Sequence, residues 1–339
     1  MSDDVQSPPN PILIFETLNA YQRTLALRSA IELGLFTAIG EGTTTPETIA
    51  KGINAAEKGT RILCDYLTIV GLLKKNATGQ YELTPDSALF LDRRSPAYLG
   101  SVVDFLGKVA EEDGFKTLTD AIRKGGTAMD ARGTMRPEHP IWVSFARSMA
   151  PLMAMPAELI AEMLTRTGAP SKVLDIAAGH GLFGIAVARQ NPGARVTAID
   201  WATVLEVARE NAAAAGVLDR YQTRPGSAFD VDFGTGYDTA LLTNFLHHFD
   251  PPTCETLLRR VRAALGPGGR ALTLEFVPNP DRVTPPLHAS FSLTMLATTD
   301  GGDAYTFAEL DRMFRNAGFA RSELHELAPT PNRVVLAYV

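Results

Sequence analysis

The chain has 339 residues, of which 45% are hydrophobic and 21% charged, with a formal net charge of −6. This length suits two domains, and the acidic balance without a long Lys/Arg block argues against a nucleic-acid partner. The only cysteines, Cys64 and Cys254, share no motif, which excludes a disulfide framework or a cysteine-based zinc site. No apolar run approaches membrane length, so we expect a cytoplasmic protein without a membrane partner.

The first hundred residues predict helices followed by a hairpin. After an acidic, proline-rich lead, helical apolar spacing over residues 12–39 predicts a long helix followed by another. Two more helices are expected within residues 45–73, and residues 74–83 resemble a two-stranded wing. This order is typical of a winged helix. The segment that would read DNA carries only Lys58 and Arg61 before it becomes apolar, which favours a packing or dimerisation module over DNA binding.

Three regions follow from this pattern: a winged-helix domain at 1–105, a helical connector at 106–168 and an α/β domain at 169–339. The connector contains a methionine-rich run at residues 141–164. Methionine is flexible and polarizable, so this run suits a pocket for a flat organic substrate, although ordinary core packing explains each methionine about as well. Pro151 and Pro156 are expected to kink or restart the helix.

From Ser171 onward, strands alternate with helices, as in a doubly wound parallel sheet. Ligands of such sheets bind beyond the carboxyl ends of the strands. The predicted strands are 173–176, 195–199, 221–223, 239–243, 271–276 and 333–338. The predicted helices include 182–189, 203–215, 253–265 and 306–317.

The first of these strands leads into a glycine turn, in VLDIAAGHGLFG at residues 173–184. Gly179 and Gly181 permit a tight turn against a ligand, and Asp200 ends the next strand, where an acid suits ribose hydroxyls. A dinucleotide pyrophosphate would be repelled by Asp175, whereas the cationic groups of S-adenosylmethionine would be attracted. The pattern therefore favours S-adenosylmethionine over a nicotinamide cofactor, which stays the alternative.

A candidate general base follows the fourth strand. Asn244, His247 and His248 lie at its predicted carboxyl end, and Glu275 lies at that of the fifth. Because a phenol has a pKa of about 10, a positioned histidine would assist methyl transfer by removing the proton. We expect His247 to be that base and Glu275 to orient it; the competing roles are a structural histidine and a salt bridge from Glu275 to Arg147. No metal-ligand cluster is evident, which predicts metal-independent transfer.

Together these motifs resemble the class I S-adenosylmethionine-dependent O-methyltransferases of the caffeate, hydroxyneurosporene and acetylserotonin type, over nearly the whole chain. The matching segments are VLDIAAGHG, Asp200, LHHFD, LGPGGRALTLEFV and TMLATTDGGDAYTFAELDRMFRNAGF. The resemblance implies a Rossmann-like doubly wound sheet with an N-terminal all-α winged-helix dimerisation domain, and a homodimer. It also implies that the first long helix reaches into the partner's pocket, through Phe15 and Tyr21, and that His247 is the base with Glu275 as its supporting acid.

The sequence departs from the family pattern at several places. Ala304 stands where the family often has a second supporting glutamate, so His247 has one acid partner only, unless Asp300 or Asp303 substitutes. Where the family usually has Asp-Trp after the base, this sequence has His248-Phe249. Ser227 stands where the adenine-contacting motif usually has an aspartate. The missing glutamate keeps open proximity-driven N- or C-methylation, or a non-methylating reaction of the same fold.

We therefore predict methyl transfer to a hydroxyl of an aromatic or polyene small molecule. A metabolite-sensing transcription regulator is a further alternative, which would require a basic wing. The predicted cofactor-binding residues are Asp175, Ala177, Gly179, Gly181, Asp200, Trp201 (by stacking on adenine), Ser227, Phe229, Asn244 and Phe245. The predicted acceptor pocket comprises Trp142, Phe145, Met149, Met153, Phe291 and Met295.

Overall fold

The computed structural model describes residues 9–111, 113–129 and 138–339. The acidic lead at residues 1–8, and residues 112 and 130–137 of the predicted connector, lie outside the described part. The chain divides into two compact units, Met1–Lys108 and Val109–Val339. Within the described ranges, no helix is both long and apolar enough to cross a bilayer.

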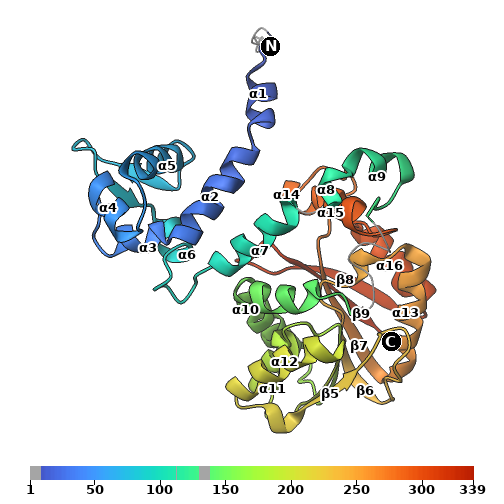
Figure 1. The fold of residues 1–339 in the computed structure, drawn as a ribbon. Helices are drawn as coiled ribbons and strands as arrows, with labels where there is room; N and C mark the ends of the chain where they lie inside the picture. Colours follow the sequence, from blue (N-terminus) through green and yellow to red (C-terminus); the bar gives the residue numbers. More distant parts are fainter. Residues whose placement is uncertain (1–8, 112, 130–137) are drawn as a thin grey trace, which may run out of the picture. The chain divides into compact units, whose positions relative to one another are not determined.

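The N-terminal unit is mainly helical, with one two-stranded antiparallel sheet (Figure 1). Where a long helix followed by another was expected over residues 12–39, the structure has three helices. Asn19 ends the first with its side-chain amide bonded to the Phe15 carbonyl, and Gly34 ends the second in the left-handed conformation. The elements are α1 (Ile12–Leu18), α2 (Tyr21–Leu33), α3 (Leu35–Gly40), α4 (Pro46–Gly52), α5 (Glu57–Ile69), β1 (Leu73–Lys75), β2 (Tyr81–Leu83) and α6 (Pro85–Phe90).

One apolar cluster holds this unit together. It is formed by α2 to α5 and the hairpin, and its fully buried members include Leu35, Ile49, Leu67 and Tyr81. By contrast, α1 buries no residue, and its side chains Ile12 to Phe15 are each more than half exposed. Such a run of exposed apolar side chains is typical of a surface that another protein covers.

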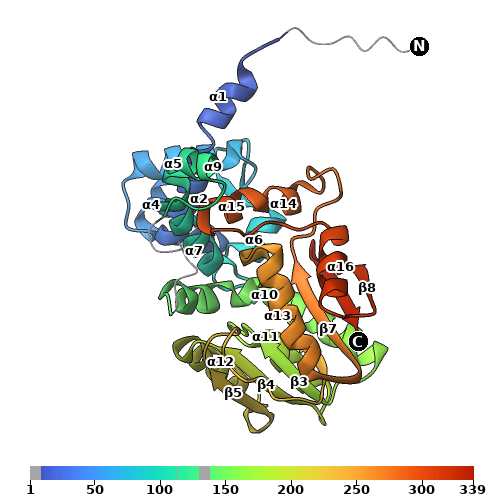
Figure 2. The same ribbon diagram turned by 90° about the vertical axis from the view of Figure 1, so that its right-hand side faces the viewer.

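The C-terminal unit is built on a seven-stranded sheet of order β5-β4-β3-β6-β7-β9-β8. Five neighbouring strands are parallel, and β9 runs antiparallel between β7 and β8. Figure 2 shows β5, β4 and β3 side by side. The strands are β3 (Lys172–Ile176), β4 (Arg195–Asp200), β5 (Tyr221–Pro225), β6 (Tyr237–Leu241), β7 (Leu265–Glu275), β8 (Arg321–Glu326) and β9 (Arg333–Tyr338).

Helices cover both faces of this sheet (Figure 1). Val173 and Leu174 point to opposite faces, because side chains alternate along a strand, and each joins a different buried cluster. One cluster includes α10 (Ile141–Thr167), α11 (Leu182–Gln190) and α12 (Ala202–Ala214), and the other includes α13 (Pro251–Ala264) and α16 (Phe307–Asn316). The remaining helices are α7 (Gly100–Glu111), which crosses the boundary between the units, α8 (Asp113–Lys116), α9 (Leu118–Lys124), α14 (Pro286–Ala289) and α15 (Phe291–Thr298).

The predicted doubly wound sheet is thus confirmed, with three local differences. The polar strand β8 was missed because its residues, RSELHE, do not alternate between apolar and polar. The strand predicted at residues 271–276 begins earlier, because β7 starts at Leu265 and includes the glycine-rich residues 266–269, where it pairs irregularly with β6. Helix α10 continues through Pro151 and Pro156 instead of restarting.

Candidate active site

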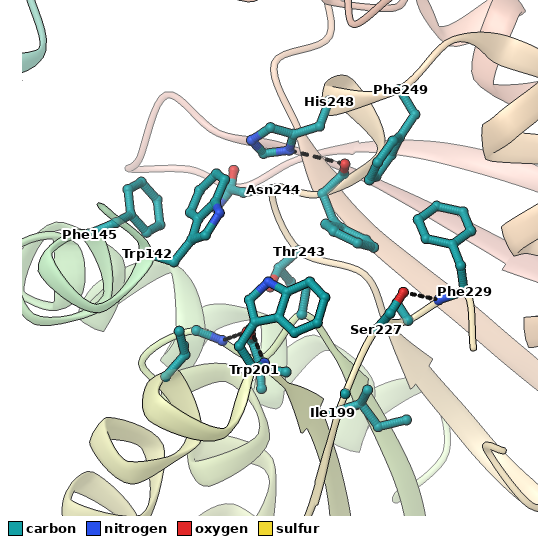
Figure 3. Close-up of a pocket in the computed structure, with 18 of the residues that line it drawn as sticks. Trp142, Phe145, Ile199, Trp201, Ser227, Phe229, Thr243, Asn244, His248 and Phe249 are labelled. Carbon is teal, nitrogen blue, oxygen red and sulfur yellow. Dashed lines mark hydrogen bonds between the residues drawn. The ribbon is translucent and has the colours of Figure 1, made fainter. Parts of the chain in front are cut away.

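A cavity of about 930 Å³ opens at the carboxyl ends of β3, β4, β5 and β6 (Figure 3). Its volume is within the usual range for a small-molecule site. The loops after the strands form most of the wall, and the first half of α10 contributes to it, with single residues from α11, α12 and α13. The predicted residues that line it are Trp142, Phe145, Met153, Ala177, Gly179, Asp200, Trp201, Ser227, Phe229, Asn244 and Phe245.

The turn after β3 brings backbone groups to the cavity. Ala177, Gly179 and Gly181 all have positive φ angles, of 53°, 57° and 77°. Such angles are easy for glycine and costly for alanine, so the strain at Ala177 marks a place where the fold overrides local preference. The Gly179 N–H donates a hydrogen bond to Oδ2 of Asp200 at 2.8 Å, which joins the turn to the end of β4.

Asp175 lies beneath this turn and does not line the cavity. Its side chain is fully buried, and Oδ2 accepts a hydrogen bond from the Gly184 N–H at 3.2 Å. Oδ1 has no hydrogen-bond partner among the described residues. Burial is the main cause that raises the pKa of Asp175 to about 7. Asp175 therefore holds the start of α11 from below.

Asp200 faces the cavity itself. Its Oδ1 accepts a hydrogen bond from the Trp201 N–H at 2.7 Å, and each oxygen keeps a free lone pair for a ligand. Burial raises the pKa of Asp200 to about 6, although these two backbone donors oppose the shift. Asp200 is therefore largely ionised at neutral pH and suited to hydroxyl donors.

Aromatic side chains line much of the cavity, among them Trp201, Phe229 and Phe249 (Figure 3). Trp201 lines the cavity, and Phe229 and Phe245 each pack edge-on against Phe249, with ring centroids 5.0 and 5.1 Å apart. Ser227 Oγ accepts a hydrogen bond from the Phe229 N–H at 3.1 Å. This wall suits a flat ring, because aromatic pairs favour stacked and edge-on contacts.

His247 and Glu275 form a buried pair behind the cavity wall. Nδ1 of His247 lies 2.5 Å from Oε2 of Glu275, and both side chains are about 95% buried or more. Oε1 of Glu275 accepts hydrogen bonds from the N–H groups of Phe245 and Leu246 and from the Thr273 hydroxyl. A carboxylate in this position can only accept, so Nδ1 of His247 carries the proton.

The second nitrogen of His247 is consequently an acceptor. Over the described chain, Nε2 has no hydrogen-bond partner, and it is not wholly buried. The His247 ring packs edge-on against Phe291 at 4.9 Å between centroids and lies 4.2 Å from the ring of His248. The pair therefore presents one basic nitrogen, held in a defined tautomer, beside the cavity.

The structure separates the competing interpretations of the charged residues. Arg147 pairs with Glu210 at 2.8 Å, so the salt bridge from Arg147 to Glu275 is wrong. Asp303 pairs with Arg282 at 3.3 Å, whereas Asp300 lines the cavity and pairs with Lys124 at 3.4 Å.

Some expected pocket residues lie outside the cavity wall. Gly181 is the N-cap of α11, Met149 is buried on α10, and Met295 is buried on α15. Phe291 stacks on Phe276 with ring centroids 3.8 Å apart. Sequence reasoning missed several cavity residues. Ala178, His180, Phe183 and Thr243 lie one or two positions from a predicted residue, whereas Val204 on α12 and Thr253 on α13 carried no such signal.

The fold and the cavity together define a class: a doubly wound α/β enzyme with an acidic and aromatic cofactor site at the carboxyl ends of its strands. A family model described as the O-methyltransferase domain matches residues 115–320, and a second, described as the O-methyltransferase dimerisation domain, matches residues 15–93.

Relatives agree over almost the full length. The 3-hydroxy-5-methyl-1-naphthoate 3-O-methyltransferase of Streptomyces sahachiroi is 28% identical, over 96% of this chain and 94% of its own. A crystal structure of a candidate O-methyltransferase from Nostoc punctiforme PCC 73102 is 53% identical, with a TM-score of 0.94, over 98% of this chain and 100% of that one. Human N-acetylserotonin methyltransferase, solved with S-adenosylmethionine, has the same fold. It is 22% identical, with a TM-score of 0.84, over 100% of this chain and 99% of that one.

The chain therefore belongs to the O-methyltransferase family and is an S-adenosylmethionine-dependent O-methyltransferase. This confirms the resemblance inferred from the motifs and decides the cofactor against the nicotinamide alternative. The N-terminal unit carries the family's dimerisation domain.

Proposed function

We propose that the enzyme methylates a hydroxyl of an aromatic or polyene small molecule, with His247 as general base and Glu275 as its orienting acid. The observation that carries this proposal is the 2.5 Å pair between His247 Nδ1 and Glu275 Oε2, which leaves Nε2 of His247 as a free acceptor. The naphthoate ring named for the Streptomyces sahachiroi relative is in keeping with an aromatic acceptor.

His247 lowers the barrier by removing the hydroxyl proton. Ionising a phenol of pKa about 10 at neutral pH costs roughly 4 kcal/mol, which a base at hydrogen-bond distance offsets as transfer proceeds. The proton moves to Nε2, and the resulting imidazolium is stabilised by the Glu275 carboxylate on the other side of the ring. General-base assistance of this kind typically contributes about 10²- to 10⁴-fold.

The donor set of the cavity fits S-adenosylmethionine, which supplies an electrophilic methyl group on a sulfonium. Asp200 would accept hydrogen bonds from the ribose hydroxyls, and Trp201 and Phe229 would enclose the adenine, with Ser227 at its edge. The strained turn at Ala177 and Gly179 would hold the methionine portion. Asp175 would support this turn from below, because its contact is with the Gly184 amide.

The acceptor would occupy the other end of the cavity. Trp142 and Phe145 lie edge-on there, with centroids 5.8 Å apart, and Met153 contacts the amide of Asn244. This apolar wall excludes water, which favours a reaction that disperses the sulfonium charge. In-line positioning is the larger contribution, at about 7 to 11 kcal/mol.

The test is transfer of labelled methyl from S-adenosylmethionine to a panel of phenols, catechols and hydroxylated polyenes, for wild type and His247→Ala. We expect transfer to fall about 10²- to 10⁴-fold in the variant, while S-adenosylhomocysteine binding persists. Equal transfer in both proteins would contradict a base role for His247.

A second candidate, proximity-driven methylation without a base, is favoured by Ala304 at the place of the family's second glutamate. Ala304 is fully buried and carries no acid, so His247 has Glu275 as its one carboxylate partner among the described residues. Transfer that is indifferent to His247 would support this candidate.

We further infer a homodimer formed through the N-terminal unit. The dimerisation-domain match and the exposed apolar side chains of α1 support it. Phe15 and Tyr21, both more than half exposed, stay the candidates for reaching the partner's pocket. Sedimentation of the whole chain and of a Phe15→Asp variant would test the assembly.

A further inference from the structure

An irregular segment between β5 and β6 forms one wall of the cavity. Residues 226–230 all line the cavity, and none of them belongs to a helix or a strand. In the proposed cofactor site, Ser227 and Phe229 of this segment border the adenine (Figure 3). Because no helix or strand pairing fixes the segment, its shape depends on single hydrogen bonds and on contacts with neighbouring elements.

The segment closes into one turn at residues 227–231. The carbonyl oxygen of Ser227 accepts hydrogen bonds from the N–H groups of Asp230 and Val231, at 3.0 and 2.9 Å. The hydroxyl oxygen of Ser227 accepts a third from the Phe229 N–H at 3.1 Å. These bonds use N–H groups of the turn, so its later carbonyl oxygens need donors from another element.

Arg260 on α13 supplies these donors. Its Nη1 donates to the carbonyl oxygen of Ala228 at 2.9 Å, and its Nη2 donates to that of Val231 at 2.6 Å. The guanidinium carbon also lies 4.7 Å from the ring centre of Phe233, a buried residue two positions beyond the turn. Among the described residues Arg260 forms no ion pair, so both arms of its planar fork serve this turn.

The guanidinium acts on the cavity through the turn, because Arg260 does not itself line the cavity. Hydrogen bonds from a charged donor are stronger than those between neutral groups, so this pair of bonds keeps the turn in one shape before a ligand arrives. Such preorganisation matters for affinity, because the apparent Kd rises as the fraction of molecules with the binding-competent shape falls.

We propose that Arg260 is a positioning residue for the cofactor, which holds the turn at residues 227–231 in the shape that receives the adenine. This inference rests on the proposed function, because it takes the adenine to lie beside Phe229. Arg260 has no part in methyl transfer itself. Its loss therefore weakens cofactor binding and leaves the chemical step unchanged.

Calorimetric binding of S-adenosylhomocysteine tests this without need of an acceptor. We expect Kd to rise about 10- to 100-fold in Arg260→Met, the size of hydrogen bonds to a charged group. Arg260→Lys keeps the charge but has one amine in place of the fork, so it should recover part of the loss. Arg259→Met, which removes a surface pair with Glu255 at 3.0 Å, is the matched control and should bind like wild type. In methylation assays, Arg260→Met should raise KM for S-adenosylmethionine and keep kcat near that of wild type.

Backbone hydrogen exchange shows whether the turn itself is loosened. In ligand-free Arg260→Met we expect faster exchange at the Asp230 and Val231 amides, protection regained at saturating S-adenosylhomocysteine, and unchanged exchange in β6. Unchanged affinity together with unchanged exchange overturns the role of Arg260 alone, and faster exchange throughout the sheet overturns a role confined to the turn. Faster exchange in the turn with unchanged affinity overturns the proposed place of the adenine, and this inference with it. The base role of His247 is untouched by these outcomes, because His247→Ala tests it separately.

Discussion

The substitution Glu275→Gln changes the tautomer of the base while keeping the shape of its partner. Oε1 of Glu275 accepts from Phe245 N–H, Leu246 N–H and the Thr273 hydroxyl at 3.1, 2.8 and 3.0 Å, and a glutamine oxygen can take over these bonds. The glutamine nitrogen then faces Nδ1 of His247, which is 2.5 Å from Oε2 in the native pair. An amide nitrogen donates, so Nδ1 must become an acceptor and the proton must move to Nε2.

A base that already carries its proton on Nε2 cannot accept one from the substrate. We therefore expect kcat for phenols of ordinary pKa to fall by about 10²- to 10⁴-fold, or about 3 to 5 kcal/mol in the barrier. The variant should bind S-adenosylhomocysteine like wild type, because Glu275 touches the predicted cofactor residues only through the Phe245 N–H, and the glutamine oxygen keeps that hydrogen bond. Initial rates with labelled methyl donor and calorimetric binding measure the two quantities.

An acceptor that is already ionised provides the internal control. A nitrophenol of pKa near 7 needs no base above that pH, so its methylation should lose far less activity in Glu275→Gln than that of an unsubstituted phenol. The same fractional loss for both acceptors would refute the tautomer argument, because it would show a general disturbance of the site. Glu255→Gln, at a surface pair with Arg259 3.0 Å away, is the matched control.

Three further predictions concern the cofactor turn and the core. Protonation near pH 6 removes the Asp200 acceptor, so wild-type affinity for S-adenosylmethionine should fall as pH drops below about 6. Asp200→Asn should bind S-adenosylmethionine about 10- to 100-fold more weakly than wild type. Calorimetry should show that the affinity of this variant depends little on pH. Gly184→Ala places Cβ 2.6 Å from Oδ2 of Asp175 and should cost about 1 to 3 kcal/mol in urea unfolding; Gly193→Ala, with open space around it, should change little. Arg270→Met leaves the carbonyls of Leu164 and Gly168 without the buried guanidinium and should cost about 3 kcal/mol, measured by thermal unfolding with and without S-adenosylhomocysteine. An unchanged midpoint would show that other groups satisfy these carbonyls.

Much of the fold could be predicted because its signals are local. Val173 and Leu174 belong to a short apolar run of the kind that forms a strand covered on both faces, and the alternation of strands with helices requires a parallel sheet. The glycine turn and Asp200 were placed at a ligand edge because parallel strands bring their carboxyl ends together. The edge strand β8 was missed since an edge strand needs no apolar pattern.

The composition of the site shows where local reasoning ends. Asp175 was expected to face the cofactor, yet its side chain points beneath the turn to the Gly184 amide. Arg147 and Glu275 were joined as one possible ion pair, yet they engage Glu210 and His247. Which side chain of a turn points into a cavity depends on backbone angles and on packing from distant elements, and neither is encoded in sequence spacing.

The sequence by itself determined the class of fold, the strand ends that carry the chemistry and the family of the enzyme, because periodicity and short motifs depend on near neighbours in the chain. Only the tertiary structure decided that His247 is held by Glu275, while His248 presents its free nitrogen to the cavity wall. Two adjacent histidines are equivalent in sequence. They differ in the folded protein because Glu275, 28 positions away, supplies a carboxylate to the ring of His247, whereas a local backbone carbonyl holds the ring of His248.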